Sequence, residues 1–260
     1  MGEDRTRRSP ETRAKLTLEV RQPGRRGAFY GRRKGHALKP RQSAVFDALL
    51  PRLALDLARP APSDLATLFP HVPSVINLEI GFGSGEHMIA EAERHSDAGF
   101  FGVEPFLNGM AKALAGIALR NLANVRLHFG DAIFLLEWLP PRSIARLDLI
   151  YPDPWPKRRH WKRRFVQEET LAAIGRVLRP GGQFRFVSDW PDYAAWTLAH
   201  VMRSRAFEWT AERAEDWRRP WPGFTETRYE AKAKKEGRSP CYLIFRRRRT
   251  DDGRWTREEG

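Results

Sequence analysis

The stretch NLEIGFGSGEH, residues 77–87, decides the predicted fold. An apolar run ends near the acid Glu79, three alternating glycines follow, and helical spacing then begins. Glycines let the backbone approach a ligand closely, and in doubly wound folds such a turn lies at the carboxyl ends of the strands, where ligands bind. The stretch therefore predicts a parallel α/β sheet with a ligand at this turn.

The spacing of the glycines favours one class of cofactor. A dinucleotide fingerprint reads GxGxxG and places a pyrophosphate on the helix N-terminus, whereas this turn reads GxGxG. The shorter spacing points to S-adenosylmethionine, with Gly81 and Gly83 against the cofactor and Glu79 near its cationic methionine end. A tight turn without a ligand is the structural alternative, and a dinucleotide-dependent dehydrogenase is a more distant one.

Strands and helices alternate regularly beyond this turn. Strands are expected at 74–81, 99–106, 124–132, 146–155 and 183–190, and helices at 85–94, 107–121, 132–139, 163–182 and 193–205. A further helix is expected at 43–57, and residues 208–249 are expected to form a strand, a long loop and a strand. This pattern predicts a doubly wound, mostly parallel sheet with late antiparallel edge strands. With a turn that points to S-adenosylmethionine, the expected fold class is the Rossmann-like S-adenosylmethionine-dependent methyltransferase type.

Acids follow the second and third predicted strands. Glu104 ends the second strand in GVEPF, about 20 residues after the glycine-rich turn, where an acid hydrogen-bonds ribose hydroxyls. Asp131 ends the third strand in HFGDA, within expected reach of an adenine amino group. Single acids at strand ends are usually solvated, but a succession of them indicates a nucleoside site.

The stretch YPDPWPKRRHWKRR, residues 151–164, follows the fourth predicted strand. Pro152 and Pro154 fix φ on either side of Asp153, so this carboxylate is expected to be rigid and able to orient a base. The six Lys and Arg residues that follow are expected where a helix begins, although positive charges at a helix N-terminus interact unfavourably with the helix dipole. This conflict indicates a functional demand, the binding of an RNA backbone; a solvated basic face is the alternative.

Composition points to a polyanionic partner. The 260 residues carry 46 Lys and Arg against 32 acids, for a net charge of +14, and residues 1–41 alone carry +9. A surplus of this size favours nucleic acid or an anionic surface as a partner. A single cysteine, Cys241, excludes an internal disulfide and a cysteine-based zinc site. No metal is expected. The sequence shows neither a membrane span nor a secretory leader, which favours a cytoplasmic location.

Three segments are expected along the chain. Residues 1–41 are a basic extension, flexible or ordered on binding, whose Phe29 and Tyr30 are candidates to stack on RNA. Residues 42–248 are the methyltransferase domain, and residues 249–260 are a charged tail.

In order and spacing, these motifs resemble those of the bacterial tRNA (guanine-N7-)-methyltransferases. The motifs are LEIGFGSGEH, GVEPF, GDA, YPDPWPKRRHWKRR, SDW and TETRYE, and the resemblance covers about residues 75–246. It implies methylation of guanine N7 at position 46 of the tRNA variable loop, with S-adenosylmethionine as the methyl donor. It leaves open whether the protein is a monomer or a homodimer.

The resemblance also implies roles for individual residues. Glu79, Glu104, Asp131 and Asp153 match the cofactor-binding acids, and Asp153 also matches the proposed catalytic residue. Substrate contacts are implied for Lys157, Asp189, Thr227, Arg228, Tyr229 and Glu230, and RNA contacts for Arg159, His160, Trp161, Lys162, Arg163 and Arg164. Asp189 or Ser188 has a second interpretation, as the cap of the helix beginning near Pro191. Trp161 stands where a polar residue is frequent in the family.

Two other classes of function stay open from the sequence. The first is a methyltransferase acting on a protein or a small molecule, which the basic segments disfavour. The second is a non-catalytic RNA-binding module with a vestigial cofactor turn, which the retained acids disfavour.

Overall fold

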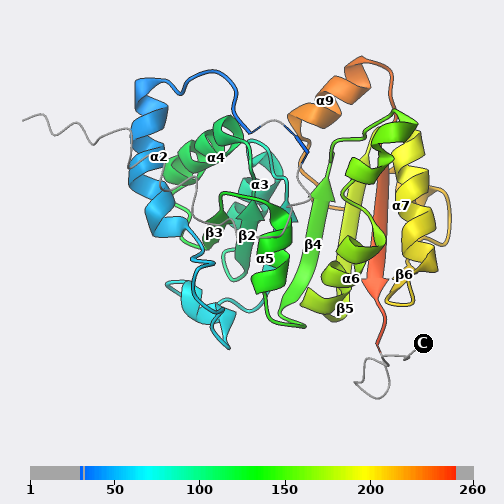
Figure 1. The fold of residues 1–260 in the computed structure, drawn as a ribbon, viewed down its shortest axis with the longest axis horizontal. Coiled ribbons are helices and arrows are strands. Elements are labelled where there is room, and N and C mark those ends of the chain that lie inside the picture. Colours follow the sequence, from blue (N-terminus) through cyan, green and yellow to red (C-terminus); the bar gives the residue numbers. More distant parts are fainter. Residues whose placement is uncertain (1–29, 32, 250–260) are drawn as a thin grey trace, which may run out of the picture.

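Strand β1 (Ile76–Ile80) lies between two parallel partners in a seven-stranded sheet. The computed structural model describes residues 30–31 and 33–249. The strand order is β3-β2-β1-β4-β5-β7-β6, and β7 runs antiparallel to both of its neighbours (Figure 1). The other strands are β2 (Gly99–Val103), β3 (Val125–His128), β4 (Ile144–Ile150), β5 (Leu178–Ser188), β6 (Phe207–Trp209) and β7 (Cys241–Arg247). The predicted fold class, including the late antiparallel edge strands, is confirmed.

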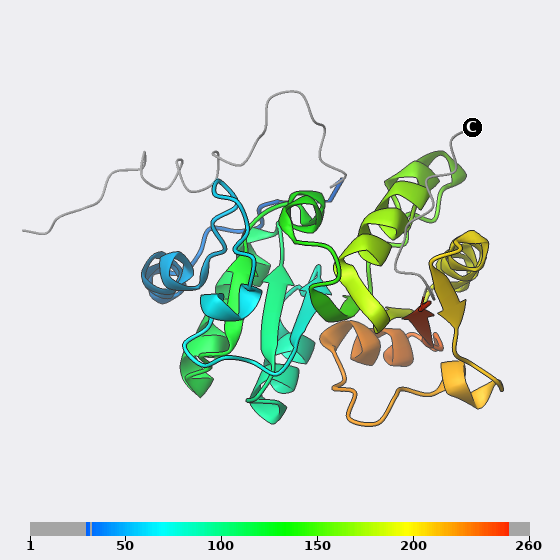
Figure 2. The ribbon, with the colours of Figure 1, turned by 90° about the horizontal axis from the view of Figure 1, so that it is seen from below.

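Helices cover both faces of this sheet, as the view from below shows (Figure 2). The α-helices are α2 (Pro40–Leu53), α3 (Glu86–Arg94), α4 (Leu107–Arg120), α5 (Ala132–Trp138), α6 (Glu168–Val177), α7 (Pro191–Arg203), α8 (Glu215–Arg218) and α9 (Arg228–Lys235). Two 3₁₀ helices add to them, η1 (Leu65–Leu68) and η2 (Arg158–Arg163). Within the described residues, no helix combines the length and the apolar character needed to span a membrane.

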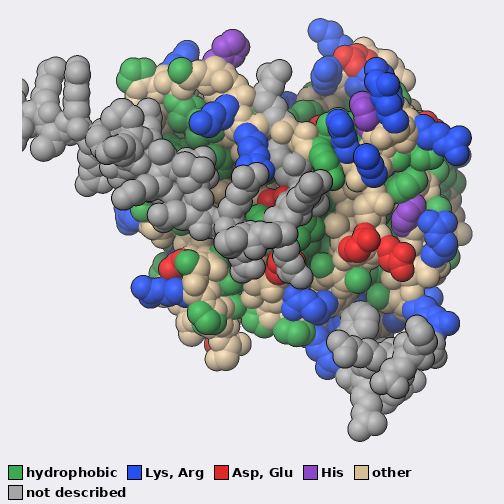
Figure 3. Space-filling view, viewed as in Figure 1, with side chains coloured by type: hydrophobic (Ala, Val, Ile, Leu, Met, Phe, Trp, Pro, Cys, Tyr) green, Lys and Arg blue, Asp and Glu red, His purple; other side chains and the backbone are tan. Residues whose placement is uncertain are grey.

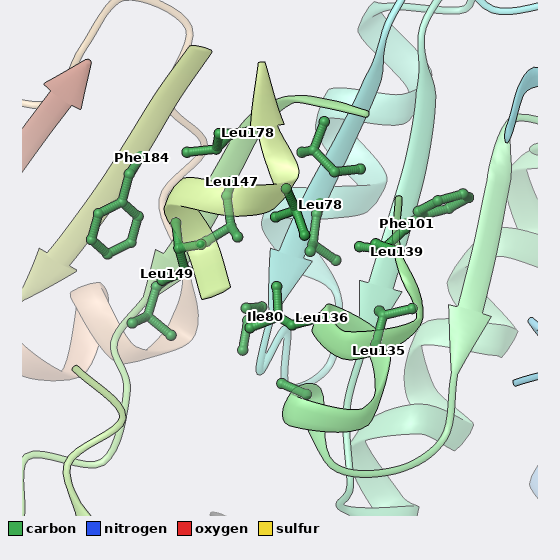
Figure 4. Close-up of a cluster of buried hydrophobic side chains, with 14 of the residues drawn as sticks. Leu78, Ile80, Phe101, Leu135, Leu136, Leu139, Leu147, Leu149, Leu178 and Phe184 are labelled. Atoms are coloured by element: carbon green, nitrogen blue, oxygen red, sulfur yellow. The ribbon is translucent and has the colours of Figure 1, made fainter. Parts of the chain in front are cut away.

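The core is split between the two faces of the sheet. On one face, side chains of β1 and β4 pack against those of α5, including Leu78, Leu147 and Leu136 (Figure 4). On the other face, α3 and α4 pack on β2 and β3 in a second cluster that includes Phe100 and Leu127. Burying one such leucine side chain contributes about 1.5–3 kcal/mol. Both faces of the central strands are therefore covered, and only the ends of these strands are open to a ligand.

The turn between β1 and α3 needs its glycines. Gly81, Gly83 and Gly85 have φ of 70°, 60° and 82°, a left-handed conformation that side chains with a Cβ rarely adopt. Gly85 is also the N-cap of α3. The turn lies at the carboxyl end of β1, as the sequence predicted.

Helix α2 differs from its predicted range of 43–57. It begins at Pro40 and ends at Leu53, after which the chain runs extended beside the edge strand β3. The Leu55 N–H donates to the carbonyl oxygen of Leu127 at 2.8 Å. Pairing with an exposed strand edge thus replaces the last predicted helical turn.

The basic segment differs from its prediction as well. It does not begin the following α-helix but forms the separate 3₁₀ helix η2, and α6 starts at Glu168. Glu168 and Glu169 occupy the first turn of α6, where acids favour the helix dipole. The expected conflict between the bases and this dipole is therefore absent.

The C-terminal third contains more helix than predicted. The long loop expected between the two late strands includes α8 and α9. The apolar periodicity of the sequence did not predict α9, because Ala233 is the only buried apolar residue of this helix. Its signal was a different one, the capping sequence Thr227-x-x-Glu230.

The predicted end of the N-terminal extension, residue 41, lies close to the start of α2. Position 41 falls inside α2, and part of the expected flexible extension is docked on the start of α4. The Asn108 side chain accepts from the Gly35 N–H at 2.8 Å and donates to the His36 carbonyl at 2.8 Å. The remainder of the extension, residues 1–29 and 32, and nearly all of the charged tail lie outside the described residues.

Candidate active site

A cavity of about 300 Å³ opens at the carboxyl ends of β1, β2 and β4. Seven of the predicted site residues line it, namely Gly81, Gly83, Glu104, Asp131, Asp153, Arg163 and Tyr229. They come from five separate segments of the chain. Four of these segments follow parallel strands, whose carboxyl ends share one edge of the sheet, and the fifth is α9, which carries Tyr229. Tyr30 and Gly31 of the N-terminal segment also line the cavity.

Glu104 ties together the two turns that form the floor of the cavity. Its carboxylate accepts hydrogen bonds from the Gly83 N–H at 2.7 Å and from the Phe106 N–H at 2.8 Å. Each carboxylate oxygen keeps a second lone pair, so it can also accept from a ligand hydroxyl. Burial raises the pKa of Glu104 to about 7.

Asp131 has a similar double use. It is the N-cap of α5, where its carboxylate accepts from the Ile133 N–H at 3.0 Å. The side chain is buried and faces the cavity. An acid that fixes a helix start and lines a pocket can hold a ligand donor in a defined place.

Asp153 lies at the mouth of the cavity on the segment after β4. The residue is exposed, yet the surrounding protein partly desolvates its carboxyl and raises its pKa. The segment is sharply turned on both sides of it, with Tyr151 and Trp155 at φ of 50° and 42°. Such conformations are strained and persist only where the surrounding structure imposes them, which is common at functional sites.

Arg163 and His160 gather around Trp155, next to the Asp153 turn. The Arg163 guanidinium lies 5.0 Å from the Trp155 ring centroid and 5.6 Å from that of Tyr30. The rings of Trp155 and His160 meet edge to face at 5.8 Å. Two basic residues that were predicted to contact RNA are therefore held beside Asp153, the candidate catalytic residue.

Other basic side chains of residues 157–164 point outward. Lys157, Arg159 and Lys162 are exposed, and none of them lines the cavity. Lys and Arg side chains gather at the upper right of the space-filling view, the part of the molecule that holds α9 and the start of α7 (Figure 3). This basic surface borders the cavity and suits a phosphate backbone.

Arg164 and Trp161, also predicted to contact RNA, do not share this surface equally. Trp161 is half-buried, and Arg164 is only 2% exposed. A guanidinium so enclosed does not reach a phosphate in this conformation. In this structure the Arg164 side chain is part of the protein interior, and its predicted RNA contact stays a prediction.

Helix α9 brings Tyr229 to the cavity with Arg228 beside it, and it keeps Thr227 and Glu230 inside the protein. Tyr229 is 44% exposed and stacks on Tyr151 at 6.3 Å, and the Arg228 guanidinium lies 4.7 Å from the Tyr229 ring. Thr227 is the N-cap of α9, where its hydroxyl accepts from the Glu230 N–H at 3.3 Å. Glu230 is buried and accepts from Tyr242 at 2.7 Å and from Lys234. These two residues hold α9 in place.

Asp189 is neither in the cavity lining nor the cap of α7. Its carboxylate accepts from Arg238 Nε at 2.6 Å, and the N-cap position of α7 is Trp190. The Ser188 hydroxyl instead accepts from the Trp190 N–H at 3.2 Å. The capping interpretation of Asp189 is therefore wrong, and the ion pair links the end of β5 to the segment after α9.

Glu79 lies beneath the glycine-rich turn and does not line the cavity. It is buried and accepts from His87 Nδ1 at 2.8 Å. Burial by itself lowers the pKa of His87, but the carboxylates of Glu79, Asp148 and Glu91 outweigh it and raise that pKa above its usual value. Glu79 and His87 thus form a buried ion pair that supports the turn from below, and the contact of Glu79 with the methionine end of the cofactor stays a prediction.

The same cluster has the spacing of a cation site. Ligand atoms of Glu79, His87 and Asp148 lie within 4.8 Å of one another. However, Arg146 pairs with Asp148 at 2.8 Å and with Glu91 at 2.7 Å. These acids already have cationic partners, so the charges are balanced within the protein.

His87, Arg146 and Tyr151 were not singled out by the sequence. Arg146 and Tyr151 contact side chains that only the fold brings beside them, Glu91 and Tyr229 respectively, and a single sequence carries little signal for such pairs. His87 had the nearest clue, because the glycine-rich turn places it eight residues after the acid that it contacts.

The fold and the cavity define a Rossmann-like S-adenosylmethionine-dependent methyltransferase. A family model described as "Putative methyltransferase" matches residues 73–242. A tRNA (guanine-N(7)-)-methyltransferase of Rhodopseudomonas palustris (strain BisB5) is 59% identical over 221 residues, which are 85% of this chain and 86% of that protein. One of Nitrobacter hamburgensis is 56% identical over 239 residues, 92% of this chain and 94% of the relative. The chain belongs to the tRNA (guanine-N(7)-)-methyltransferase family, as the motifs indicated.

Among solved structures, the 16S rRNA methyltransferase KamB is similar, with a TM-score of 0.48 and 16% identity. The match covers 68% of this chain and 89% of KamB.

Proposed function

We propose that the protein transfers the methyl group of S-adenosylmethionine to N7 of a guanine in tRNA, at position 46 of the variable loop. The observation that carries the proposal is the place of Asp153, at the mouth of a cavity floored by Glu104 and Asp131 and bordered by exposed bases. One edge of the cavity thus suits a nucleoside and the other a polyanion.

The residues present fit S-adenosylmethionine. A Cβ built on Gly81 would meet nothing within 4 Å, so the missing side chain leaves room for a ligand at the turn. Glu104 would accept from the ribose hydroxyls, and Asp131 would accept from the adenine amino group. The bound cofactor supplies a methyl group on a positively charged sulfur. Glu79 would act from below, by fixing the turn through His87.

Asp153 suits the chemistry of the acceptor. Guanine N7 carries a free lone pair, so no proton has to be removed before the methyl group arrives. The reaction moves a positive charge from sulfur to the purine, and a carboxylate held at the cavity mouth stabilises that charge as it develops. Asp153 would also accept from the donors on the Watson–Crick edge and so hold the base in line with the methyl group.

The basic surface would hold the tRNA backbone while the base enters. Lys157, Arg159 and Lys162 are exposed and lie within a few residues of Asp153. Tyr229, exposed beside the cavity, offers a ring on which an unstacked base could rest. Use of a tRNA acceptor would place the enzyme in the cytoplasm.

The proposal is tested by methyl transfer from labelled S-adenosylmethionine to tRNA, followed by nucleoside analysis. We expect a single new nucleoside, 7-methylguanosine. Transcripts made with 7-deazaguanosine lack the accepting nitrogen and should take up no label, and a transcript with adenine at position 46 tests the target position. Label on another nucleoside would overturn the assigned acceptor atom, and label only on protein would favour the alternative substrate class.

A further inference from the structure

The buried guanidinium of Arg164 connects the two segments that carry Asp153 and Asp189. Its Nε donates to the carbonyl oxygen of Pro154 at 3.0 Å, one residue after Asp153. Its Nη1 lies 3.4 Å from the carbonyl oxygen of Asp192, in the first turn of α7. The segment after β4 is thereby fastened to the helix that follows β5.

Three aromatic rings enclose this guanidinium. Its central carbon lies 5.0 Å from the ring centroid of Trp161, 4.9 Å from Tyr193 and 5.2 Å from Trp196. We call these three residues the aromatic cage. A guanidinium can stack its flat faces on rings while its in-plane N–H groups bond to carbonyls, which an ammonium group does not do.

The cage is itself fixed to the protein. Trp196 Nε1 donates to the Val166 carbonyl at 2.8 Å, and the Val166 N–H donates to the Tyr193 hydroxyl at 3.3 Å. The Gln167 side chain donates to the Trp161 carbonyl at 2.9 Å. Trp161, unusual in its position in the basic segment, therefore forms one wall of the cage.

Burial of this charge is costly and lowers the pKa of Arg164, and the nearby Asp192 carboxylate offsets that cost only in part, without forming an ion pair. Among residues 30–31 and 33–249, no carboxylate lies within ion-pair distance of Arg164, and its Nη2 has no hydrogen-bond partner. A buried cation held only by carbonyls and rings costs stability that an apolar side chain would not. A cost of this kind at one residue next to an active site points to a functional demand.

We propose that Arg164 is a positioning residue for methyl transfer, one that holds the Asp153 turn at a fixed distance from α7. The proposal rests on the role proposed for Asp153 above. Arg164 does not contact tRNA: it sets the direction of the Asp153 carboxylate, whereas its exposed neighbours bind the backbone. The six Lys and Arg residues of 157–164 thus have two roles: Arg164 positions Asp153, and the exposed residues bind the tRNA backbone.

Three variants separate these tasks: R164Q, R164K and, as the matched control, K162Q, which removes an exposed charge from the same segment. For each, kcat and KM for tRNA are measured over a range of salt concentrations, and S-adenosylmethionine calorimetry counts the folded sites. We expect R164Q to lower kcat per folded site about 100-fold and R164K about tenfold, because a small misplacement of a reacting group has effects of this size. For both variants, KM should change less than threefold and the salt dependence should stay that of the wild type.

K162Q should behave in the opposite way. Its effect should lie in tRNA binding: kcat/KM should fall, and the negative slope of log kcat/KM against log salt should become shallower by about 0.7–0.9, the value for one lost phosphate contact. An R164Q protein with normal kcat and this reduced slope would overturn the proposal. So would an R164K protein with the wild-type kcat, or a loss of activity that only follows the number of folded sites.

A second readout does not depend on activity. In protein labelled with 5-fluorotryptophan, the ¹⁹F resonance of Trp155, assigned through W155F, reports on the Asp153 turn. We expect it to shift or broaden in R164Q and R164K and to stay in place in K162Q. An unchanged resonance in R164Q would overturn the proposal. Absence of 7-methylguanosine from the wild type would count against the proposed function alone, and the resonance would still decide the role of Arg164.

Discussion

The carboxylate of Glu104, which follows β2, accepts a 2.7 Å hydrogen bond from the backbone N–H of Gly83, in the turn after β1. The bond joins two of the segments that would hold the cofactor, the one proposed to bind the ribose and the glycine-rich turn. Because this carboxyl is also buried, its protonation is coupled to both folding and cofactor binding.

Glu104 should make the stability of the free enzyme depend on pH. Burial raises its folded pKa to about 7, above the unfolded value of 4.5. Between these values the folded state binds more protons than the unfolded one, so the contribution of Glu104 is largest below pH 4.5 and is lost as the pH rises to 7. From pH 5 to pH 8, wild type should lose about 2–3 kcal/mol of unfolding free energy relative to E104Q. Urea titrations of both proteins across this range measure the difference; a constant difference would contradict the raised pKa.

Replacement of Asp153 should affect turnover far more than cofactor affinity. D153A and D153N remove the carboxylate but leave the floor of the cavity intact, since Glu104 and Asp131 are unchanged. We expect kcat to fall about 10²–10³-fold, the size typical of a lost electrostatic contact to the transition state. The dissociation constant of S-adenosylmethionine, measured by calorimetry, should change less than threefold. Equal losses in both quantities would assign Asp153 to cofactor binding instead.

Glu79 and His87 should matter first for stability. Removing one partner of a buried ion pair leaves an uncompensated group and costs about 3–5 kcal/mol. We therefore expect E79Q and H87L each to lower the unfolding free energy by several kcal/mol, measured by urea denaturation. The control is E93Q, which breaks the half-exposed pair with Arg120 and should cost less than about 1 kcal/mol. A folded E79Q protein that has lost cofactor affinity without losing stability would restore the direct contact that the sequence predicted.

Thr227 should act through the start of α9. Its hydroxyl caps the helix, so T227A should cost about 1 kcal/mol of unfolding free energy and T227S should cost little, since serine caps as well as threonine. Fraying at this end would displace Arg228 and Tyr229, and the KM for tRNA should therefore rise in T227A and not in T227S. Steady-state kinetics and urea denaturation of both variants test this. If T227S lost as much stability and tRNA affinity as T227A, the side-chain methyl group rather than the hydroxyl would be responsible.

The sequence was sufficient wherever a pattern is local. The apolar run before Gly81, the glycine spacing and the acid after each strand all act within a few residues, and the structure places Glu104, Asp131 and Asp153 at one cavity. The parallel topology explains why these acids meet, because it brings the carboxyl ends of the strands to a common edge of the sheet.

Long-range contacts decide the residues that the sequence placed differently. The sequence around Glu79 does not predict the hydrogen bond between its carboxylate and His87. Likewise, nothing in KRRHWKRR predicts that Arg164 is buried while basic residues beside it are exposed. The aromatic cage that encloses Arg164 draws Tyr193 and Trp196 from α7, about 30 residues away. Charge type is visible in a sequence, but burial of that charge depends on what packs against it.

The position of β7 bears on how the protein is built during synthesis. This strand is inserted between β5 and β6 although it follows both of them in the chain, so neither neighbour is paired along that edge until β7 has left the ribosome. The strands and turns around Glu104 and Asp131 can assemble earlier, since their partners are already translated. Helix α9 directly precedes β7 and is joined to it by the Glu230–Tyr242 hydrogen bond, so we expect α9 to take its place after the cofactor side of the cavity has formed.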